Sequence, residues 1–180
     1  MAKGLESIVN KEHHEVKKTK RHFDVAHVLG TIGSYVGSAA FAYLGSRITN
    51  RPYLSAVIGS SLGDYVGYDA GFTPYWYWKN RDRYKGWKGK TKFLKDFVSF
   101  NARAIPLDIA AYAVAVPLAI GATFLTGNPV TGALLAGVAT DIGYWLGLRK
   151  LNKRKIQEVA AEKVYNHSSS AHMPYKPAYG

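Results

Sequence analysis

Pro52–Gly71 reads PYLSAVIGSSLGDYVGYDAG, a mainly apolar stretch with an aspartate near its middle. Its length matches the roughly 20 residues that a helix needs to cross a bilayer. Glycine recurs at every fourth position within it, at Gly59, Gly63, Gly67 and Gly71. On a helix this spacing leaves one nearly bare face, which a second helix can approach closely. The stretch therefore predicts a tightly packed membrane span, with Asp64 beside the packing face.

The same layout returns from Pro129 to Gly147, at an offset of 77 residues. Asp141 takes the place of Asp64, and each aspartate follows its proline by 12 positions. Further identities at this offset are Phe23 with Phe100, Tyr35 with Tyr112, Thr49 with Thr126, and Ala56 with Ala133. Each copy holds two predicted spans, so both copies enter the membrane in the same sense. We interpret the chain as an internal repeat of two tandem, parallel helical hairpins.

Bulk composition suggests a soluble basic protein, because the 180 residues carry a net charge of +12 and a mean hydropathy of −0.15. The charges are clustered, however, and Ile109–Thr140 contains none. That run alone holds most of two spans, separated by a turn-like Gly-Asn-Pro sequence. We predict an all-α integral membrane protein with a membrane domain at 23–148. Its four transmembrane helices are expected at about 23–46, 53–78, 97–124 and 129–148.

Three basic segments flank these spans: an N-terminal segment 1–22, a loop 79–95 and a C-terminal region 149–180. With four spans all three lie on one side, and an excess of lysine and arginine marks the cytoplasmic side. Both termini are therefore predicted to be cytoplasmic. Segment 1–22 is either a weak amphipathic helix on the membrane surface or a solvated tail. The C-terminal region is expected to begin as a basic helix and to be disordered from Asn166 to Gly180.

The loop Lys79–Lys95 holds eight lysines or arginines and one acid, Asp82, with Tyr84 and Trp87 among them. Basic residues interleaved with aromatic ones occur in nucleic-acid-binding proteins. A short loop between two spans is better placed to face anionic lipid headgroups. We therefore predict membrane lipids as partners at this loop, and no nucleic acid.

Three aspartates lie at similar depth within the predicted spans, at Asp64, Asp108 and Asp141. An aspartate at the centre of a span costs about 2.5–3.5 kcal/mol on insertion scales, so each should face the bundle interior. They are candidates for a proton or cation relay, or for a polar site that holds a headgroup. Alternatively they fix packing by interhelical hydrogen bonds. The tyrosines suited to such bonds are Tyr35, Tyr68, Tyr112 and Tyr144.

A second group of ionisable residues is predicted nearer the cytoplasmic surface, comprising Asp24, His27, Asp69 and Arg103. Arg103 is a candidate ion-pair partner for Asp24 or Asp69. His27 follows Asp24 by about one helical turn, so the two can share a helix face. The spans contain no His-x3-His or comparable ligand spacing, and we predict no metal site.

Glycines suited to close helix contact occur in three of the four predicted spans. They are Gly33 and Gly37 in the first span, Gly59, Gly63, Gly67 and Gly71 in the second, and Gly143 and Gly147 in the fourth. Such faces can build the bundle itself or join the chain to other chains. A homo-oligomer or a hetero-complex is therefore expected.

The sequence offers no constellation for catalysis. It has no cysteine, no Gly-x-Ser-x-Gly elbow, no phosphate-binding glycine loop and no His-Glu-x-x-His motif. We predict a non-enzymatic protein without catalytic residues or a cofactor.

Phe97, Asp108 and Tyr112 are spaced like the aromatic–aspartate–aromatic pattern that opens a hairpin in the GtrA-like family. Over roughly residues 20–150 the chain resembles that family of small membrane proteins, which also have four spans in two tandem hairpins. The resemblance implies movement of polyprenyl-phosphate-linked sugars across a membrane. The family's Asn-Phe and Asn-Arg-aromatic signature at the ends of spans 2 and 4 is absent, so the resemblance assigns no binding residue.

Two functions stay open at this point. One is a small translocation protein that moves a proton, a cation or a lipid-linked headgroup past the mid-membrane aspartates. The other is a structural or accessory subunit of a larger membrane complex, which packs through its glycine-striped helices.

Overall fold

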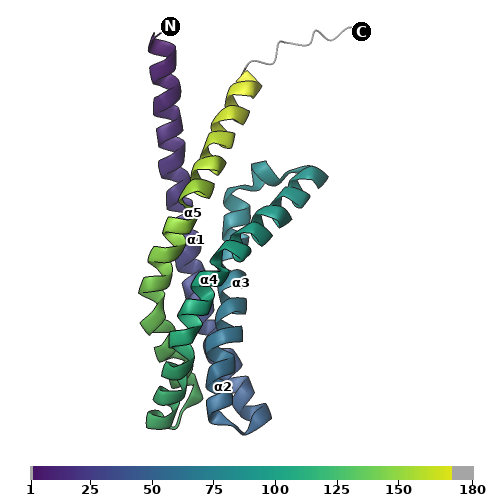
Figure 1. The fold of residues 1–180 in the computed structure, drawn as a ribbon. Coiled ribbons are helices and arrows are strands. Elements are labelled where there is room, and N and C mark those ends of the chain that lie inside the picture. The colour runs from purple at the N-terminus through teal and green to yellow at the C-terminus, as the bar shows by residue number, and fades with distance from the viewer. Residues whose placement is uncertain (1, 172–180) are drawn as a thin grey trace. The chain divides into compact units, whose positions relative to one another are not determined.

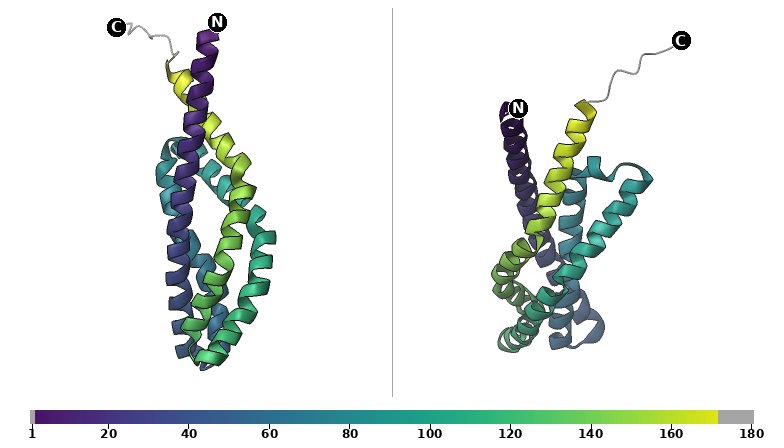
Figure 2. Two further views of the ribbon diagram at one scale, coloured as in Figure 1. Left: turned by 90° about the vertical axis from the view of Figure 1, so that its left-hand side faces the viewer. Right: turned by 45° about the horizontal axis from the view of Figure 1, so that its top comes forward.

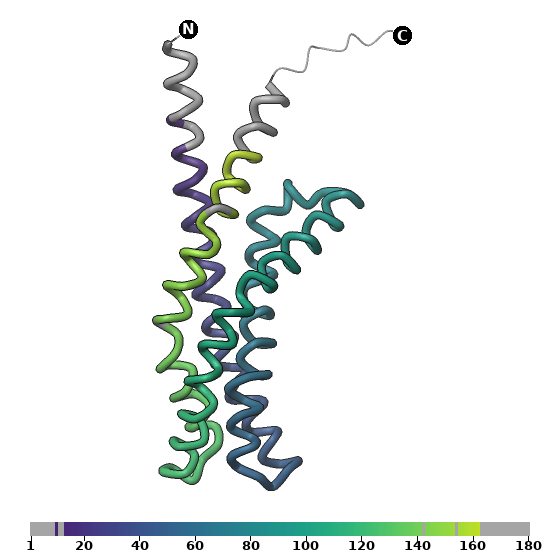
Figure 3. The backbone as a smooth tube through the Cα atoms, in the orientation of Figure 1, coloured from purple at the N-terminus to yellow at the C-terminus, as the bar shows by residue number. Residues whose placement is uncertain are grey.

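The computed structural model describes residues 2–171, with side chains placed except at 2–9, 11–12, 142, 154 and 163–171 (Figure 3). All elements in residues 2–171 are helices, so the prediction of an all-α fold is confirmed. The residues fall into two compact units. One combines the start of the chain, up to Phe23, with its end, from Lys153. The other is Asp24–Asn152. The membrane domain at 23–148 stays a prediction.

Three long helices, α1, α4 and α5, make up most of residues 2–171, and four shorter helical elements lie between α1 and α4 (Figure 1). The elements are α1 (Ala2–Thr49), α2 (Pro52–Ile58), the π-helix η1 (Gly59–Gly63), α3 (Asp64–Lys79), the 3-10 helix η2 (Arg81–Tyr84), α4 (Gly86–Thr126) and α5 (Pro129–Ala171). By length and composition, two of them could cross a membrane, at His13–Thr49 and Gly86–Thr126. The second predicted span instead consists of three short elements that follow one another without a break from Pro52 to Lys79.

The two long terminal helices extend beyond the predicted spans. Helix α1 runs through the predicted boundary at Phe23 without interruption. Helix α5 reaches Ala171, although disorder was expected from Asn166. Neither proline nor glycine occurs between Leu148 and Met173, so no backbone constraint ends the helix at Asn166. The rest of the predicted disordered tail, 172–180, lies outside the described residues.

In the first unit, buried side chains come from both helices: Thr19 and Phe23 from α1, Ile156 and Val159 from α5. Two ion pairs within single helices of this unit are Glu15–Lys18 on α1 and Lys155–Glu158 on α5. Such pairs on a helix surface contribute only a few tenths of a kcal/mol each.

In the second unit, two short links with similar geometry each join the two arms of one helical hairpin. Asn50 and Gly127, 77 positions apart, both adopt positive φ, at 51° and 66°. The backbone N–H of Arg51 donates a hydrogen bond of 3.3 Å to the hydroxyl oxygen of Thr49. In the second link, the backbone N–H of Asn128 donates the equivalent bond, also of 3.3 Å, to the hydroxyl oxygen of Thr126. Figures 1 and 2 show both links at the same end of the unit. This agreement supports the internal repeat.

We call α1 from Asp24 together with α2, η1 and α3 the first hairpin, and α4 with α5 up to Asn152 the second. The hairpins differ at η1, where five residues of the first one form a π-helix. The equivalent residues of the second lie within the α-helix α5. A π-helical turn is wider than an α-helical turn and often occurs at functional sites. It ends directly before Asp64, so it sets the direction in which that side chain leaves the helix.

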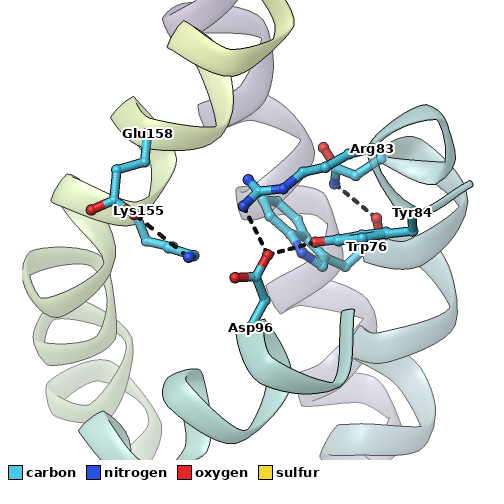
Figure 4. A network of polar contacts seen from close by, with 7 residues as sticks. Trp76, Arg83, Tyr84, Asp96, Lys155 and Glu158 are labelled. Atoms are coloured by element: carbon cyan, nitrogen blue, oxygen red, sulfur yellow. Dashed lines mark hydrogen bonds and ion pairs between the residues drawn. The ribbon is translucent and has the colours of Figure 1, made fainter. Parts of the chain in front are cut away.

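A buried polar network stabilises the connection between α3 and α4 at the other end of this unit (Figure 4). The Arg83 guanidinium lies 2.9 Å from the Asp96 carboxylate, and these side chains are only 6% and 14% exposed. The Tyr84 hydroxyl donates to Asp96 at 3.4 Å and accepts from the Trp76 indole. Burial raises the pKa of Tyr84 to about 12, with Arg83 opposing the shift and Asp96 adding to it. The network holds the short η2 segment against the start of α4.

Candidate functional site

A polar cavity of about 40 Å³ lies inside the Asp24–Asn152 unit. Four carboxyl groups line it, from Asp64 and Asp69 on α3, Asp108 on α4 and Asp141 on α5. Hydroxyl groups complete much of the lining, among them those of Thr31, Ser34, Ser60, Tyr112, Thr140 and Tyr144. No lysine or arginine in the described part of the chain lines the cavity. A volume of this size holds about three water molecules.

A glycine seam in the first hairpin brings Ser34 and Tyr35 of α1 close to the cavity. A Cβ atom at Gly33 would lie 2.2 Å from the carbonyl oxygen of Gly67, and one at Gly37 would lie 2.1 Å from that of Gly63. Only glycine permits such an approach of two helix backbones.

The other predicted packing glycines behave in three ways. Gly59 and Gly71 lie in the same first-hairpin seam, where a Cβ atom would meet the carbonyl oxygens of Ser38 at 2.6 Å and Leu29 at 2.1 Å. At Gly147, the obstacle is the side chain of Leu107 at 2.7 Å. At Gly143, nothing lies within 4 Å. The close backbone contact therefore belongs to the first hairpin, where the glycines of α1 face those of η1 and α3 in the same chain.

Two hydrogen bonds cross between the hairpins in equivalent positions. The Tyr35 hydroxyl of the first hairpin donates to the Asp141 carboxylate of the second. The Tyr112 hydroxyl of the second hairpin lies 3.3 Å from Asp64 Oδ2 of the first. Both the tyrosines and the aspartates are 77 positions apart in sequence. The two hairpins are thus joined by a pair of exchanged contacts, as in a symmetric dimer.

Three further hydrogen bonds have no equivalent in the other hairpin. Ser34 donates to Asp64, and the Tyr144 hydroxyl donates to Asp108 Oδ1 at 2.6 Å. His27 Nδ1 lies 2.8 Å from the Tyr68 hydroxyl. Each of the three mid-span aspartates therefore accepts at least one hydroxyl, and three of the four tyrosines proposed as partners supply one.

The predicted second group of ionisable residues does not assemble. Asp69 and His27 line the cavity, whereas Asp24 and Arg103 do not. Asp24 pairs with Arg149 at 3.7 Å rather than with Arg103. Arg103 is exposed on α4, so its side chain points away from the bundle interior.

Replacing Tyr35 with phenylalanine is expected to cost more stability than replacing Tyr112 with phenylalanine. Among the described residues, Tyr35 is the hydroxyl donor to Asp141, while Asp64 keeps Ser34 when Tyr112 is lost. A carboxylate that loses its donor in a buried site costs about 1–3 kcal/mol. Unfolding of the purified variants by denaturant checks the order. Equal losses for both variants would contradict it.

The cavity combines acids, hydroxyls and room for water, a set of groups suited to the exchange of protons. No group of three or more histidine or acidic side chains in the described part of the chain is arranged to hold a metal ion. The aspartates and tyrosines of the cavity could be predicted from the sequence, whereas Ser34 and Ser60 could not. Both serines occur in glycine-rich spans, where a serine is equally expected as a small packing residue. No protein-family model, curated protein or solved structure matches this chain.

Proposed function

We propose that the protein is a multi-pass membrane protein whose acidic cavity relays protons across the bilayer. The observation that carries the proposal is the cavity itself, because it gathers four carboxyl groups and several hydroxyls without a lysine or arginine among its described lining. In a membrane, ionisable residues inside a bundle are costly and commonly mark proton relays.

The distribution of side chains supports a membrane setting. Large apolar side chains point outward, for example Ile109, Leu125 and Val138, which are 66%, 83% and 57% exposed. Small and polar residues fill the interior, including Ser38, Ser55 and Thr123. The two apolar helices bury only 33% and 17% of their most apolar stretches, unlike the core helices of soluble proteins. Exposed apolar surface of this extent calls for lipid or a partner. Four crossings follow if both hairpins span the bilayer.

Protons fit the cavity better than a lipid-linked headgroup does. A lipid-linked sugar carries a negatively charged phosphate, which the four carboxyl groups would repel. The cavity is also far smaller than sites for drug-sized ligands, which span about 300–1,000 Å³. The hydroxyl and carboxyl groups that line the cavity are donors and acceptors between which a proton can pass.

The subunit alternative draws less support from the glycines. Gly33, Gly37, Gly63 and Gly67 pack against each other inside the chain. They consequently present no free face to a partner, and a partner would have to use other surfaces.

Proton flux in liposomes tests the proposal. The protein is reconstituted with a pH-sensitive dye inside, and a potassium gradient with valinomycin drives proton entry. The double variant Asp64→Asn and Asp141→Asn should lower the rate about tenfold or more, equivalent to about 1.4 kcal/mol of added barrier. Asp82→Asn, on an exposed loop, is the matched control and should leave the rate unchanged. Undiminished flux in the double variant would refute the proposal.

The crossing number and orientation form a separate prediction. The chain has no native cysteine, so single cysteines report their side of the membrane. Trp87 and Ile48 are suitable sites because their side chains are 82% and 81% exposed. In right-side-out vesicles, an impermeant maleimide should label Ile48→Cys only, and in inverted vesicles Trp87→Cys only. Labelling of both positions from one side would exclude four spans.

A further inference from the structure

A groove of about 350 Å³ lies between α4 and α5, on the second hairpin. Its apolar lining comes from Leu107, Ala110 and Val114 of α4 and from Ala139 and Gly143 of α5. Nothing lies within 4 Å of a Cβ atom built at Gly143, so this part of the groove is open. The volume falls within the range of small-molecule sites.

The repeat explains why the second hairpin holds this groove. The seam glycines of the first hairpin are replaced, at an offset of 77, by larger residues: Gly33 by Ala110, Gly37 by Val114, Gly63 by Thr140 and Gly67 by Tyr144. The glycines let the first hairpin close on its backbone. Their bulkier counterparts hold α4 and α5 apart at the same level, and the groove is the resulting space.

The inner wall of the groove is shared with the acidic cavity. Ala111, Thr140 and Tyr144 line both spaces. Tyr144 donates a hydrogen bond of 2.6 Å to Asp108, and Asp108 and Asp141 line the cavity on the other side. An occupant of the groove would therefore contact apolar side chains along its length and an aromatic ring backed by carboxylates at its inner end.

We infer that the groove binds a lipophilic monovalent organic cation, which enters from the side between α4 and α5. The apolar part of the ligand would lie against Val114 and Gly143, and its charge would lie near the Tyr144 ring. A ring face attracts a cation, and low dielectric surroundings strengthen the attraction of Asp108 and Asp141. Neither the groove nor the cavity has a lysine or arginine among its described lining to oppose a positive ligand. The inference rests on the proposed function in one respect only, that this face meets lipid.

Protection of a cysteine tests the inference with two probes that have the same shape and opposite charge, tetraphenylphosphonium and tetraphenylborate. Gly143→Cys places a thiol in the groove. Gly121→Cys is the matched control, because Gly121 is also a helical glycine with nothing within 4 Å but lies outside the groove. In detergent solution, tetraphenylphosphonium should slow alkylation of Gly143→Cys by N-ethylmaleimide at least fivefold, and tetraphenylborate should not. Neither probe should protect Gly121→Cys.

Adding Asp108→Asn to Gly143→Cys should remove most of the protection, while the unliganded alkylation rate stays the same and shows that the groove is intact. Equal protection by both probes, or by neither, would overturn the inference. So would cross-linking of Gly143→Cys between chains that blocks alkylation, since a second copy would then fill the groove. Binding is measured without a proton gradient, so failure of proton flux and failure of cation binding are separate results.

Discussion

Gly67→Ala is expected to destabilise the protein by about 3 kcal/mol or more, even though alanine favours helices over glycine. The new Cβ atom would lie 2.1 Å from the carbonyl oxygen of Gly33 on the facing helix. That oxygen belongs to the backbone, so no side-chain rotation relieves the overlap and the helices must separate. Separation also weakens the contact from Ser34 to Asp64. Denaturant unfolding in detergent, followed by circular dichroism, measures the loss.

Gly121→Ala provides the matched control for this change. Gly121 also lies within a helix, but a Cβ atom there meets nothing within 4 Å. Only the gain in helix propensity remains, and stability should rise by about 0.5–1 kcal/mol. Each variant adds one methyl group to a helical glycine, so the difference between their stabilities reports the backbone contact at Gly67. If Gly67→Ala proved as stable as Gly121→Ala, the seam would not be the close helix contact described above.

Asp96→Ala is expected to cost about 3–5 kcal/mol, because it takes the carboxylate away from a buried guanidinium. Arg83 is only 6% exposed, and the 2.9 Å ion pair with Asp96 offsets much of the cost of burying its charge. The substitution also removes the acceptor of the Tyr84 hydroxyl, so η2 loses two anchors to α4. Thermal unfolding monitored by the fluorescence of Trp76 and its neighbours provides the measurement.

Two controls separate the buried charge from a general loop effect. Asp82→Ala breaks an ion pair with Lys85 whose side chains are 82% and 75% exposed, and the expected cost is below about 1 kcal/mol. The double variant Arg83→Met and Asp96→Leu removes both charges and should recover most of the stability. A double variant as unstable as Asp96→Ala would show that the ion pair itself, rather than an uncompensated charge, stabilises the connection.

Much of the architecture follows from local sequence signals. Pro52 and Pro129 mark two helix starts because proline is favoured in the first turn of a helix. Asn50 and Gly127, two positions before these prolines, are residues that tolerate positive φ, so the two links could be located. The aspartates could be placed inside the bundle because a charge is costly in lipid.

The remaining features depend on tertiary contacts that no local pattern encodes. The π-helix over Gly59–Gly63 has the sequence Gly-Ser-Ser-Leu-Gly, in which no local signal distinguishes a π-helical turn from an α-helical one. The pairing of Asp24 with Arg149 joins α1 to α5, which are distant in sequence. The groove beside Gly143 likewise depends on both helices of the second hairpin, because the positions equivalent to the seam glycines hold Ala110 and Val114 on α4 and Thr140 and Tyr144 on α5.

The exchanged tyrosine–aspartate contacts also have a consequence for biosynthesis. A ribosome produces the chain from its N-terminus, so Asp64 emerges before its partner Tyr112 exists, whereas Asp141 emerges after Tyr35. During that interval, the hydroxyl of Ser34 in the first hairpin can donate a hydrogen bond to Asp64. At the position equivalent to Ser34, the second hairpin has Ala111, which offers Asp141 no such group. We expect the first hairpin to form with a hydrogen-bond donor already supplied to Asp64, and the second hairpin to need the first one as the source of the donor to Asp141.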